Sequence, residues 1–148
     1  MRKSLLIAVD FDGTIVEDKY PGVGKAKPFA IETLKMLQND GHRLILWTYR
    51  HGSKLQDAVK FMEDNGVPPY AVNRSYPEEA PHPSDVSRKI HADLFIDDRN
   101  FGGFPGWGEI YQKLNKEPNS PLPKKKGWFR RMQRAQNLRL VFATSNLL

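Results

Sequence analysis

The sequence contains no cysteine, so it can form no disulfide bond and can use no thiolate as a nucleophile or metal ligand. A chain without disulfides suits a reducing compartment, and we expect a cytoplasmic protein. The sequence also lacks an apolar run of about 18 residues, so no transmembrane helix is expected. Basic residues precede the first apolar run, but that run reaches Asp10 without a small-residue cleavage site. We therefore interpret it as a strand rather than a signal peptide.

Acidic residues are missing from residues 118–148, which contain seven basic ones. The whole chain has a formal net charge of +6, whereas residues 1–117 contain 16 basic and 17 acidic residues. This near-neutral balance argues against a nucleic-acid-binding domain over residues 1–117. Residues 117–127 are rich in proline and lysine, as is typical of linkers. We predict one domain over residues 1–117, followed by a basic linker and C-terminal tail over residues 118–148.

The C-terminal tail combines its basic residues with aromatic ones such as Trp128 and Phe129. This mixture is typical of segments that bind nucleic acid or an anionic membrane surface. Two other interpretations stay open for this tail. It can be a helix that docks on a partner, or a disordered end that increases solubility.

Short apolar runs alternate with segments of helical spacing along the first 116 residues. This alternation predicts βαβ units and therefore an α/β fold, with a parallel sheet in three layers. The expected strands lie within residues 5–9, 42–50, 69–76 and 93–100, and the expected helices within residues 28–41, 53–66, 84–92 and 109–116.

Local signals predict where the helices begin and which faces they bury. Phe29, Ile31, Leu34 and Leu37 recur near helical spacing, so we expect them on the buried face of the first helix. Ser53 precedes the next helical pattern and is expected to be its N-cap.

Aromatic and histidine residues outside these patterns are expected to be structural. Phe101, Phe104 and Trp107 follow the last predicted strand, and we expect them to pack over the sheet edge rather than to contact a substrate. His42 and His82 are expected on the surface.

Two carboxylates end the first predicted strand, in the stretch DFDGT over residues 10–14. Carboxylates two residues apart, here Asp10 and Asp12, can divide the roles of nucleophile and general acid/base. Asp97 and Asp98 close the last predicted strand. Ligands bind outside the carboxyl ends of parallel strands, and hard oxygen ligands are those that Mg²⁺ prefers. The alternative for the first pair is a capped Asp-Gly turn.

Three further polar residues lie near predicted strand ends. Thr48 ends the second strand, where its hydroxyl can bind an anionic oxygen. Lys89 lies eight residues before Asp97, and its charge could screen the repulsion between a carboxylate and a phosphate dianion. Arg50 could bind a second anionic group of a substrate, because a guanidinium matches phosphate and carboxylate geometry. A surface ion pair is the equal alternative for Arg50.

The order and strand context of these motifs resemble the haloacid dehalogenase (HAD) superfamily, on its phosphotransferase side. The resemblance covers roughly residues 5–114 and implies a Rossmann-like fold and an aspartyl-phosphate mechanism. By this resemblance Asp10 is the nucleophile and Asp12 the acid/base, while Thr48 and Lys89 hold the transferring phosphoryl group.

The same resemblance implies a Mg²⁺ site formed by Asp97, Asp98, Asp10 and the backbone carbonyl of Asp12. Because adjacent residues of a regular strand point in opposite directions, it stays open whether Asp97 or Asp98 is the main ligand. It also stays open whether Lys89 or its neighbour Arg88 faces the site.

HAD enzymes usually add a cap domain, and this sequence leaves no room for one. Residues 14–28 allow only a short flap, and one helix, one strand and a loop fill residues 48–89. The chain therefore resembles small, capless bacterial members, whose open site suits a large phosphorylated substrate. We expect a Mg²⁺-dependent phosphatase of phosphate monoesters. The alternatives are a polynucleotide-end phosphatase and a catalytically poor binding module that acts through its basic tail.

Overall fold

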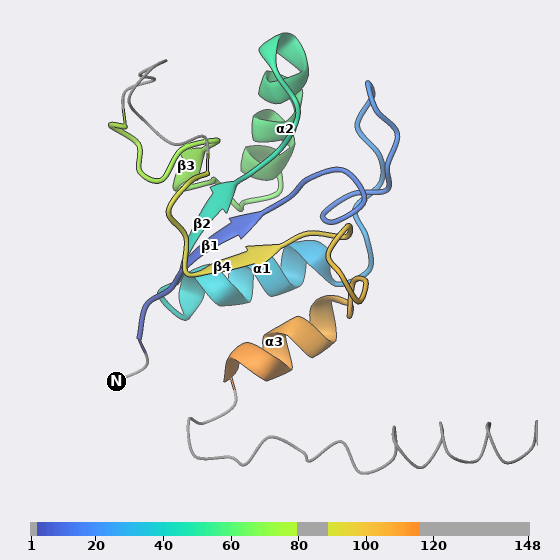
Figure 1. Cartoon of the computed structure of the whole chain (residues 1–148). Helices are drawn as coiled ribbons and strands as arrows, with labels where there is room; N and C mark the ends of the chain where they lie inside the picture. Colours follow the sequence, from blue (N-terminus) through green and yellow to red (C-terminus); the bar gives the residue numbers. More distant parts are fainter. Residues whose placement is uncertain (1–2, 80–88, 116–148) are drawn as a thin grey trace, which may run out of the picture. The chain divides into compact units, whose positions relative to one another are not determined.

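A computed structural model describes residues 3–79 and 89–115, which form a four-stranded sheet with three α-helices (Figure 1). The elements are β1 (Leu6–Val9), α1 (Ala30–Asn39), β2 (Arg43–Leu46), α2 (Gly52–Asp64), β3 (Ala71–Val72), β4 (Leu94–Ile96) and α3 (Trp107–Asn115). The strands run parallel in the order β3-β2-β1-β4. The predicted parallel α/β fold is confirmed, and its strand order is compatible with a Rossmann-like fold. Within the described ranges, no helix is long and apolar enough to span a bilayer.

The order of the strands reverses at β1. From β1 the chain passes through α1 to β2 and through α2 to β3, always toward the same side of the sheet. It then returns past β1 to add β4 on the opposite side. Parallel α/β sheets bind ligands at such a switch point, outside the carboxyl ends of the strands. The fold therefore marks the ends of β1 and β4 as the place for a site.

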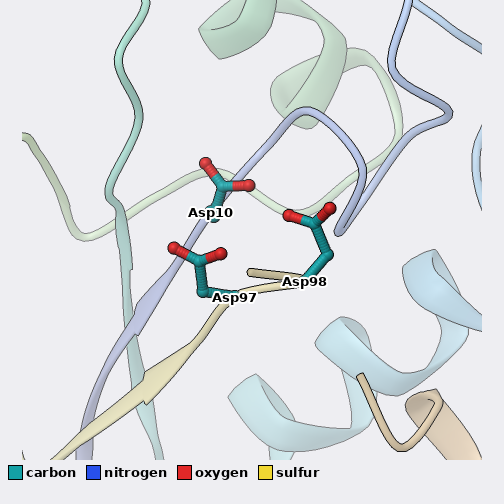
Figure 2. A group of neighbouring side chains, drawn as sticks. All are labelled: Asp10, Asp97 and Asp98. Carbon is teal, nitrogen blue, oxygen red and sulfur yellow. The ribbon is translucent and has the colours of Figure 1, made fainter. Parts of the chain in front are cut away.

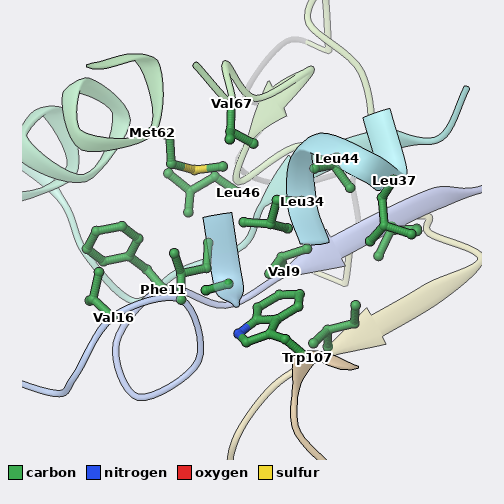
Figure 3. Packing of buried hydrophobic residues seen from close by; sticks show 14 of the residues in the cluster. Val9, Phe11, Val16, Leu34, Leu37, Leu44, Leu46, Met62, Val67 and Trp107 are labelled. Atoms are coloured by element: carbon green, nitrogen blue, oxygen red, sulfur yellow. The ribbon is translucent and has the colours of Figure 1, made fainter. Parts of the chain in front are cut away.

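One face of the sheet carries the main hydrophobic core (Figure 3). Side chains alternate along a strand, so Ile7 and Val9 of β1 point to the same face, together with Leu44 and Leu46 of β2. All three helices contribute to this core, and their fully or nearly buried members are Ala30, Leu34, Leu37, Ala58, Met62, Trp107 and Ile110. The helices thus pack against one face of the sheet and stabilise the strands whose carboxyl ends form the site.

The opposite face of the sheet carries a smaller cluster that contains Ala8, Ile45, Ala71 and Ile90. Ile90 belongs to residues 89–92, which precede β4 and are not helical. The helix predicted over residues 84–92 is therefore absent from its described part, and residues 84–88 lie outside the description. Among the described residues, helices pack on one face of the sheet only.

Three local predictions are wrong, and they concern Phe29, Ser53 and His42. Phe29 adopts a left-handed backbone with φ of 62° before α1 begins, and its side chain is 69% exposed. Ser53 is not the N-cap of α2, because the helix already begins after His51. His42 is buried rather than on the surface, since its Nδ1 accepts a hydrogen bond of 3.1 Å from the amide of Leu5.

The aromatic loop before α3 packs as predicted at two of its three positions. Trp107 is buried, and its indole N–H donates to the carbonyl oxygen of Thr14 at 3.0 Å. Phe104 meets Trp107 edge-on, with ring centroids 5.7 Å apart. Phe101, in contrast, is exposed. Trp107 thus connects α3 directly to the loop that follows β1.

The buried face of α1 can be tested with two substitutions on the same helix. Leu34→Ala should lower the free energy of unfolding by about 2–5 kcal/mol, because the side chain is fully buried and its removal leaves a cavity. Met36→Ala, on the exposed side, should lower it by less than about 1 kcal/mol. Urea unfolding followed by circular dichroism measures both. Equal losses would contradict the assigned orientation of α1.

Candidate active site

Three carboxylates meet at the carboxyl edge of the sheet, as Figure 2 shows for Asp10, Asp97 and Asp98. Each residue offers one oxygen atom, and these oxygens all lie within 4.8 Å of one another. Asp10 follows β1 and Asp97 follows β4, and the two strands pair in parallel, so their ends coincide. The amide of Asp10 donates to the carbonyl of Ile96 at 2.9 Å. We call these three residues the acidic cluster.

Both adjacent acids reach the acidic cluster because neither belongs to a regular strand. β4 ends at Ile96, and Asp97 and Asp98 lie in the turn that follows. The alternation expected along a strand therefore does not apply to them. The amide of Arg99 donates to Oδ1 of Asp97 at 2.8 Å, which stabilises that turn.

Thr14 connects two members of the acidic cluster. Its Oγ1 lies 3.1 Å from Oδ2 of Asp10 and 3.4 Å from Oδ1 of Asp98, and it accepts a hydrogen bond of 2.9 Å from the amide of Asp98. Thr14 is fully buried. Sequence reasoning assigned it no role, although its position four residues after Asp10, in a turn, brings its hydroxyl back to the strand end.

Gly13 provides the space that the acidic cluster needs. Its φ is +82°, a backbone conformation that side chains with a Cβ atom disfavour. A Cβ atom at this position would lie 2.5 Å from Oδ2 of Asp98. The loop after β1 can therefore approach Asp98 only because residue 13 is glycine.

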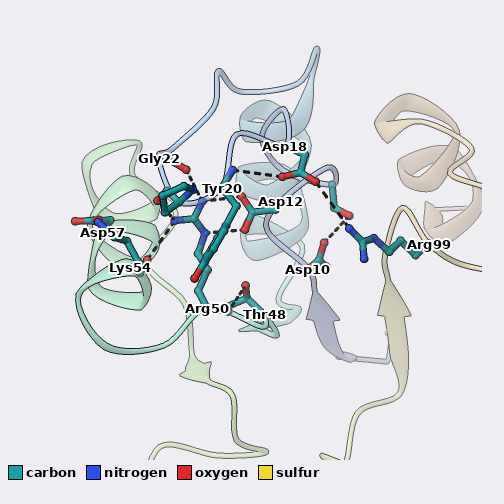
Figure 4. A network of polar contacts seen from close by, with 12 residues as sticks. Asp10, Asp12, Asp18, Tyr20, Gly22, Thr48, Arg50, Lys54, Asp57 and Arg99 are labelled. Atoms are coloured by element: carbon teal, nitrogen blue, oxygen red, sulfur yellow. Dashed lines mark hydrogen bonds and ion pairs between the residues drawn. The ribbon is translucent and has the colours of Figure 1, made fainter.

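Asp12 does not join the acidic cluster but pairs with Arg50 (Figure 4). The guanidinium donates from Nε to Oδ2 of Asp12 at 2.7 Å and from a terminal nitrogen to Oδ1 at 2.6 Å. Arg50 is only 2% exposed, so the predicted surface ion pair is in fact a buried one. Hydrogen bonding to Asp12 raises the pKa of Arg50.

The remaining donors of Arg50 bond to backbone carbonyls. Its terminal nitrogens donate to Gly22 at 2.6 Å, to Pro21 at 3.2 Å and to Lys54 at 3.4 Å. The five N–H groups of the guanidinium thus meet five acceptors. The prediction that Arg50 binds an anionic group of a substrate is therefore wrong for this arrangement, since no donor is left for such a group.

Thr48 lies two residues after the end of β2 and lines the same cavity as Asp10 and Asp97. Its amide donates to Oδ1 of Asn73 at 2.8 Å, and its hydroxyl accepts from the amide of Arg50 at 3.2 Å. Asn73 has φ of 51°, which asparagine tolerates better than most residues. Sequence reasoning missed Asn73, because it placed this residue inside the strand predicted over residues 69–76, whereas β3 ends at Val72 and Asn73 follows it.

The predicted residues surround a cavity of about 600 Å³. Its lining comprises Asp10, Asp12, Asp18, Tyr20, Trp47, Thr48, Tyr49, Arg50, Asp97 and Arg99. Two of the lining residues form an ion pair: Oδ2 of Asp18, in the flap, lies 3.8 Å from a terminal nitrogen of Arg99. Lys89 is exposed and does not line this cavity, and Arg88 lies outside the described residues. The structure therefore brings together all predicted site residues that it describes except Lys89.

Burial raises the pKa of Asp10 from its usual 3.8 to about 6. The charges of Asp97 and Asp98 add to the increase, whereas hydrogen bonds from the backbone at Phe11 and from the hydroxyl of Thr14 oppose it. The acidic cluster thus gathers negative charge at a half-buried place. Such a site favours a proton or a cation.

The chain is similar to a solved structure of a conserved protein from Bacteroides thetaiotaomicron. The two sequences are 53% identical, the match covers 78% of this chain and 94% of that chain, and the TM-score is 0.71. The chain matches no model of a protein family and no curated protein sequence.

The raised pKa of Asp10 predicts a pH-dependent stability in EDTA. The folded protein binds the proton of Asp10 more tightly than the unfolded chain does, because the folded pKa of about 6 exceeds the usual 3.8. This stabilisation is fully present below pH 3.8 and is lost as the pH rises through about 6. The stability of the wild type relative to Asp10→Asn should therefore fall over this range. Denaturant titrations of both proteins would contradict this if their difference were independent of pH.

Gly13→Ala should destabilise the protein more than Gly41→Ala. Both glycines have left-handed backbones, with φ of +82° and +87°, so an alanine at either costs about 1–2 kcal/mol. Only at Gly13 does the new Cβ collide with Asp98, which should add about 1–3 kcal/mol. Equal free energies of unfolding for the two variants, measured in urea, would show that Asp98 moves away without cost.

Proposed function

The chain belongs to the same family as the conserved protein of Bacteroides thetaiotaomicron, and from the geometry of its site we propose a Mg²⁺-dependent phosphatase of the HAD type. One observation carries this proposal. Asp10, Asp97 and Asp98 converge at the carboxyl edge of the sheet, and Asp10 and Asp97 line a cavity together with Asp12 and Thr48. This arrangement supplies a nucleophile, an acid/base, a hydroxyl donor and a cation site within one cavity.

The acidic cluster has the chemistry of a Mg²⁺ site. Three carboxylates with oxygens within 4.8 Å of one another offer the hard ligands that this ion prefers. The raised pKa of Asp10 reflects buried negative charge that a cation would neutralise. Asp10, Asp97 and Asp98 would hold the ion, joined by the backbone carbonyl of Asp12. When bound, Mg²⁺ neutralises charge on the phosphate oxygens.

In the first half of the reaction, the phosphoryl group moves to Asp10. A carboxylate oxygen of Asp10 attacks phosphorus, and the bond between phosphorus and the ester oxygen breaks. In this step Asp12 carries a proton on an oxygen lone pair that Arg50 does not use, and the ester oxygen takes this proton and leaves as the alcohol. The products of this half are an aspartyl phosphate on Asp10 and an ionised Asp12.

In the second half, water releases the phosphoryl group. Asp12 removes a proton from a water molecule as the water oxygen attacks phosphorus. The bond between phosphorus and the oxygen of Asp10 breaks, so inorganic phosphate leaves and Asp10 is again a free carboxylate. Asp12 regains its proton, and the cycle is balanced.

The hydroxyl of Thr48 lines the cavity, which supports a role in holding the phosphoryl oxygens. For Lys89 the same role rests on the resemblance to the HAD superfamily alone. Arg99 also lines the cavity and supplies a positive charge there.

An open cavity favours substrates whose phosphate group extends from a larger molecule. Within residues 3–79 no inserted domain covers the carboxyl edge of the sheet, and the flap before α1 is short. The predicted contacts of residues 118–148 with nucleic acid or an anionic surface stay predictions, because this segment lies outside the described residues. A 3′- or 5′-phosphorylated oligonucleotide remains one substrate to test.

The proposed function is tested by phosphate release from a panel of sugar phosphates, nucleotides and phosphorylated oligonucleotides. EDTA and Asp10→Asn should each abolish turnover, and Asp12→Asn should lower kcat by about 10²–10⁴-fold. Asp64→Asn is the matched control, because Asp64 pairs with Lys60 on the surface of α2, and this variant should retain full activity. Folded wild-type protein that releases no phosphate from any member of the panel would refute the proposal.

A further inference from the structure

The buried guanidinium of Arg50 forms hydrogen bonds with three segments: the loop after β1, the flap and α2. It donates to Asp12, to the flap carbonyls of Pro21 and Gly22, and to the carbonyl of Lys54 in the first turn of α2. A cation this deeply buried is costly unless it is paired and fully hydrogen-bonded, and here every donor has an acceptor. The loop after β1, the flap and α2 therefore all fix the position of the guanidinium.

Two aromatic rings also hold the guanidinium in place. Its central carbon lies 5.0 Å from the centre of the Phe11 ring and 5.4 Å from that of the Tyr20 ring. Phe11 belongs to the same loop as Asp12, whereas Tyr20 belongs to the flap. Arg50 thus contacts the loop and the flap through both hydrogen bonds and ring faces.

Asp12 depends on this arrangement for its orientation. Within the described part of the chain, both hydrogen bonds to its carboxylate come from Arg50. A carboxylate has about four lone-pair sites, so one on each oxygen stays available to other groups. Because Asp12 lines the cavity, those sites are accessible to a substrate.

We propose that Arg50 is a positioning residue, which acts on the reaction by holding the carboxylate of Asp12 toward the ester oxygen of the substrate. This inference rests on the proposed phosphatase function and deepens it. The planar fork of arginine matters here, because a lysine keeps the charge but cannot donate to both oxygens of Asp12 with the same geometry. Misplacement of Asp12 should therefore impair proton transfer more than substrate binding.

The test compares two substrates that differ in their need for a proton. Nitrophenolate leaves p-nitrophenyl phosphate without protonation, whereas the alkoxide of glycerol 2-phosphate needs a proton. Arg50→Lys should lower kcat/KM for glycerol 2-phosphate by at least about tenfold more than for p-nitrophenyl phosphate. A partly unfolded variant loses activity on both substrates by the same factor, so the ratio of the losses is independent of folding. Arg50→Gln serves as a second variant.

Two controls separate positioning from stability. Arg43→Lys alters an arginine at the other end of β2, which bonds to the hydroxyl of Tyr70, and should leave the ratio unchanged. Arg50→Lys added to Asp12→Asn should lower kcat/KM by no more than about twofold further, since Arg50 acts through Asp12.

The outcomes distinguish the two proposals. An active wild type with equal losses on both substrates overturns the positioning role of Arg50 and leaves the phosphatase function standing. Additive losses in the double variant overturn the positioning role as well. A wild-type protein that hydrolyses neither substrate overturns the proposed function, and the role of Arg50 with it.

Discussion

The site depends on the parallel pairing of β1 with its two neighbours. Because β2 and β4 both run parallel to β1, their carboxyl ends reach the same edge, and Thr48, Asp10 and Asp97 follow them there. This convergence places carboxylates in a half-buried position, and the pKa of Asp10 is raised mainly by that burial and further by the charges of Asp97 and Asp98. The hydrophobic core beneath the sheet includes residues of all three strands and so fixes where their ends lie.

The connection between the core and the acidic cluster is short. The indole of Trp107 bonds to the carbonyl of Thr14, and the hydroxyl of Thr14 bonds to the acidic cluster. Two hydrogen bonds, both made by Thr14, thus connect the buried Trp107 of α3 to Asp10. The packing of α3 in the core therefore helps to position the carboxylates of the acidic cluster.

The parts of the fold that sequence reasoning predicted are those that local signals determine. Apolar runs that end in Asp10, Thr48 and Asp97 mark strand ends, and the alternation of strands with helices determines that these ends meet. Residues at helix starts were less predictable, because Phe29 was expected on the buried face of α1 and Ser53 as the N-cap of α2, and neither has that role.

The partner of Arg50 could not be predicted from the sequence. Asp12 and Arg50 are 38 positions apart, and their contact depends on how closely the flap and α2 approach the loop after β1. The buried position of His42 has a similar cause, since its acceptor nitrogen meets the amide of Leu5, 37 positions away. Contacts of this kind follow from packing, and no local motif encodes them.

The different partners of Asp10 and Asp12 give the cavity an electrical polarity. One wall presents Asp10 and Asp97 of the acidic cluster, whereas in the other wall the charge of Asp12 is balanced by Arg50. The electrostatic potential is therefore most negative at the first wall and rises toward the second. A small cation and a larger anionic group that enter together are sorted by this gradient, so the direction in which a bound molecule lies is determined by charge before shape takes effect.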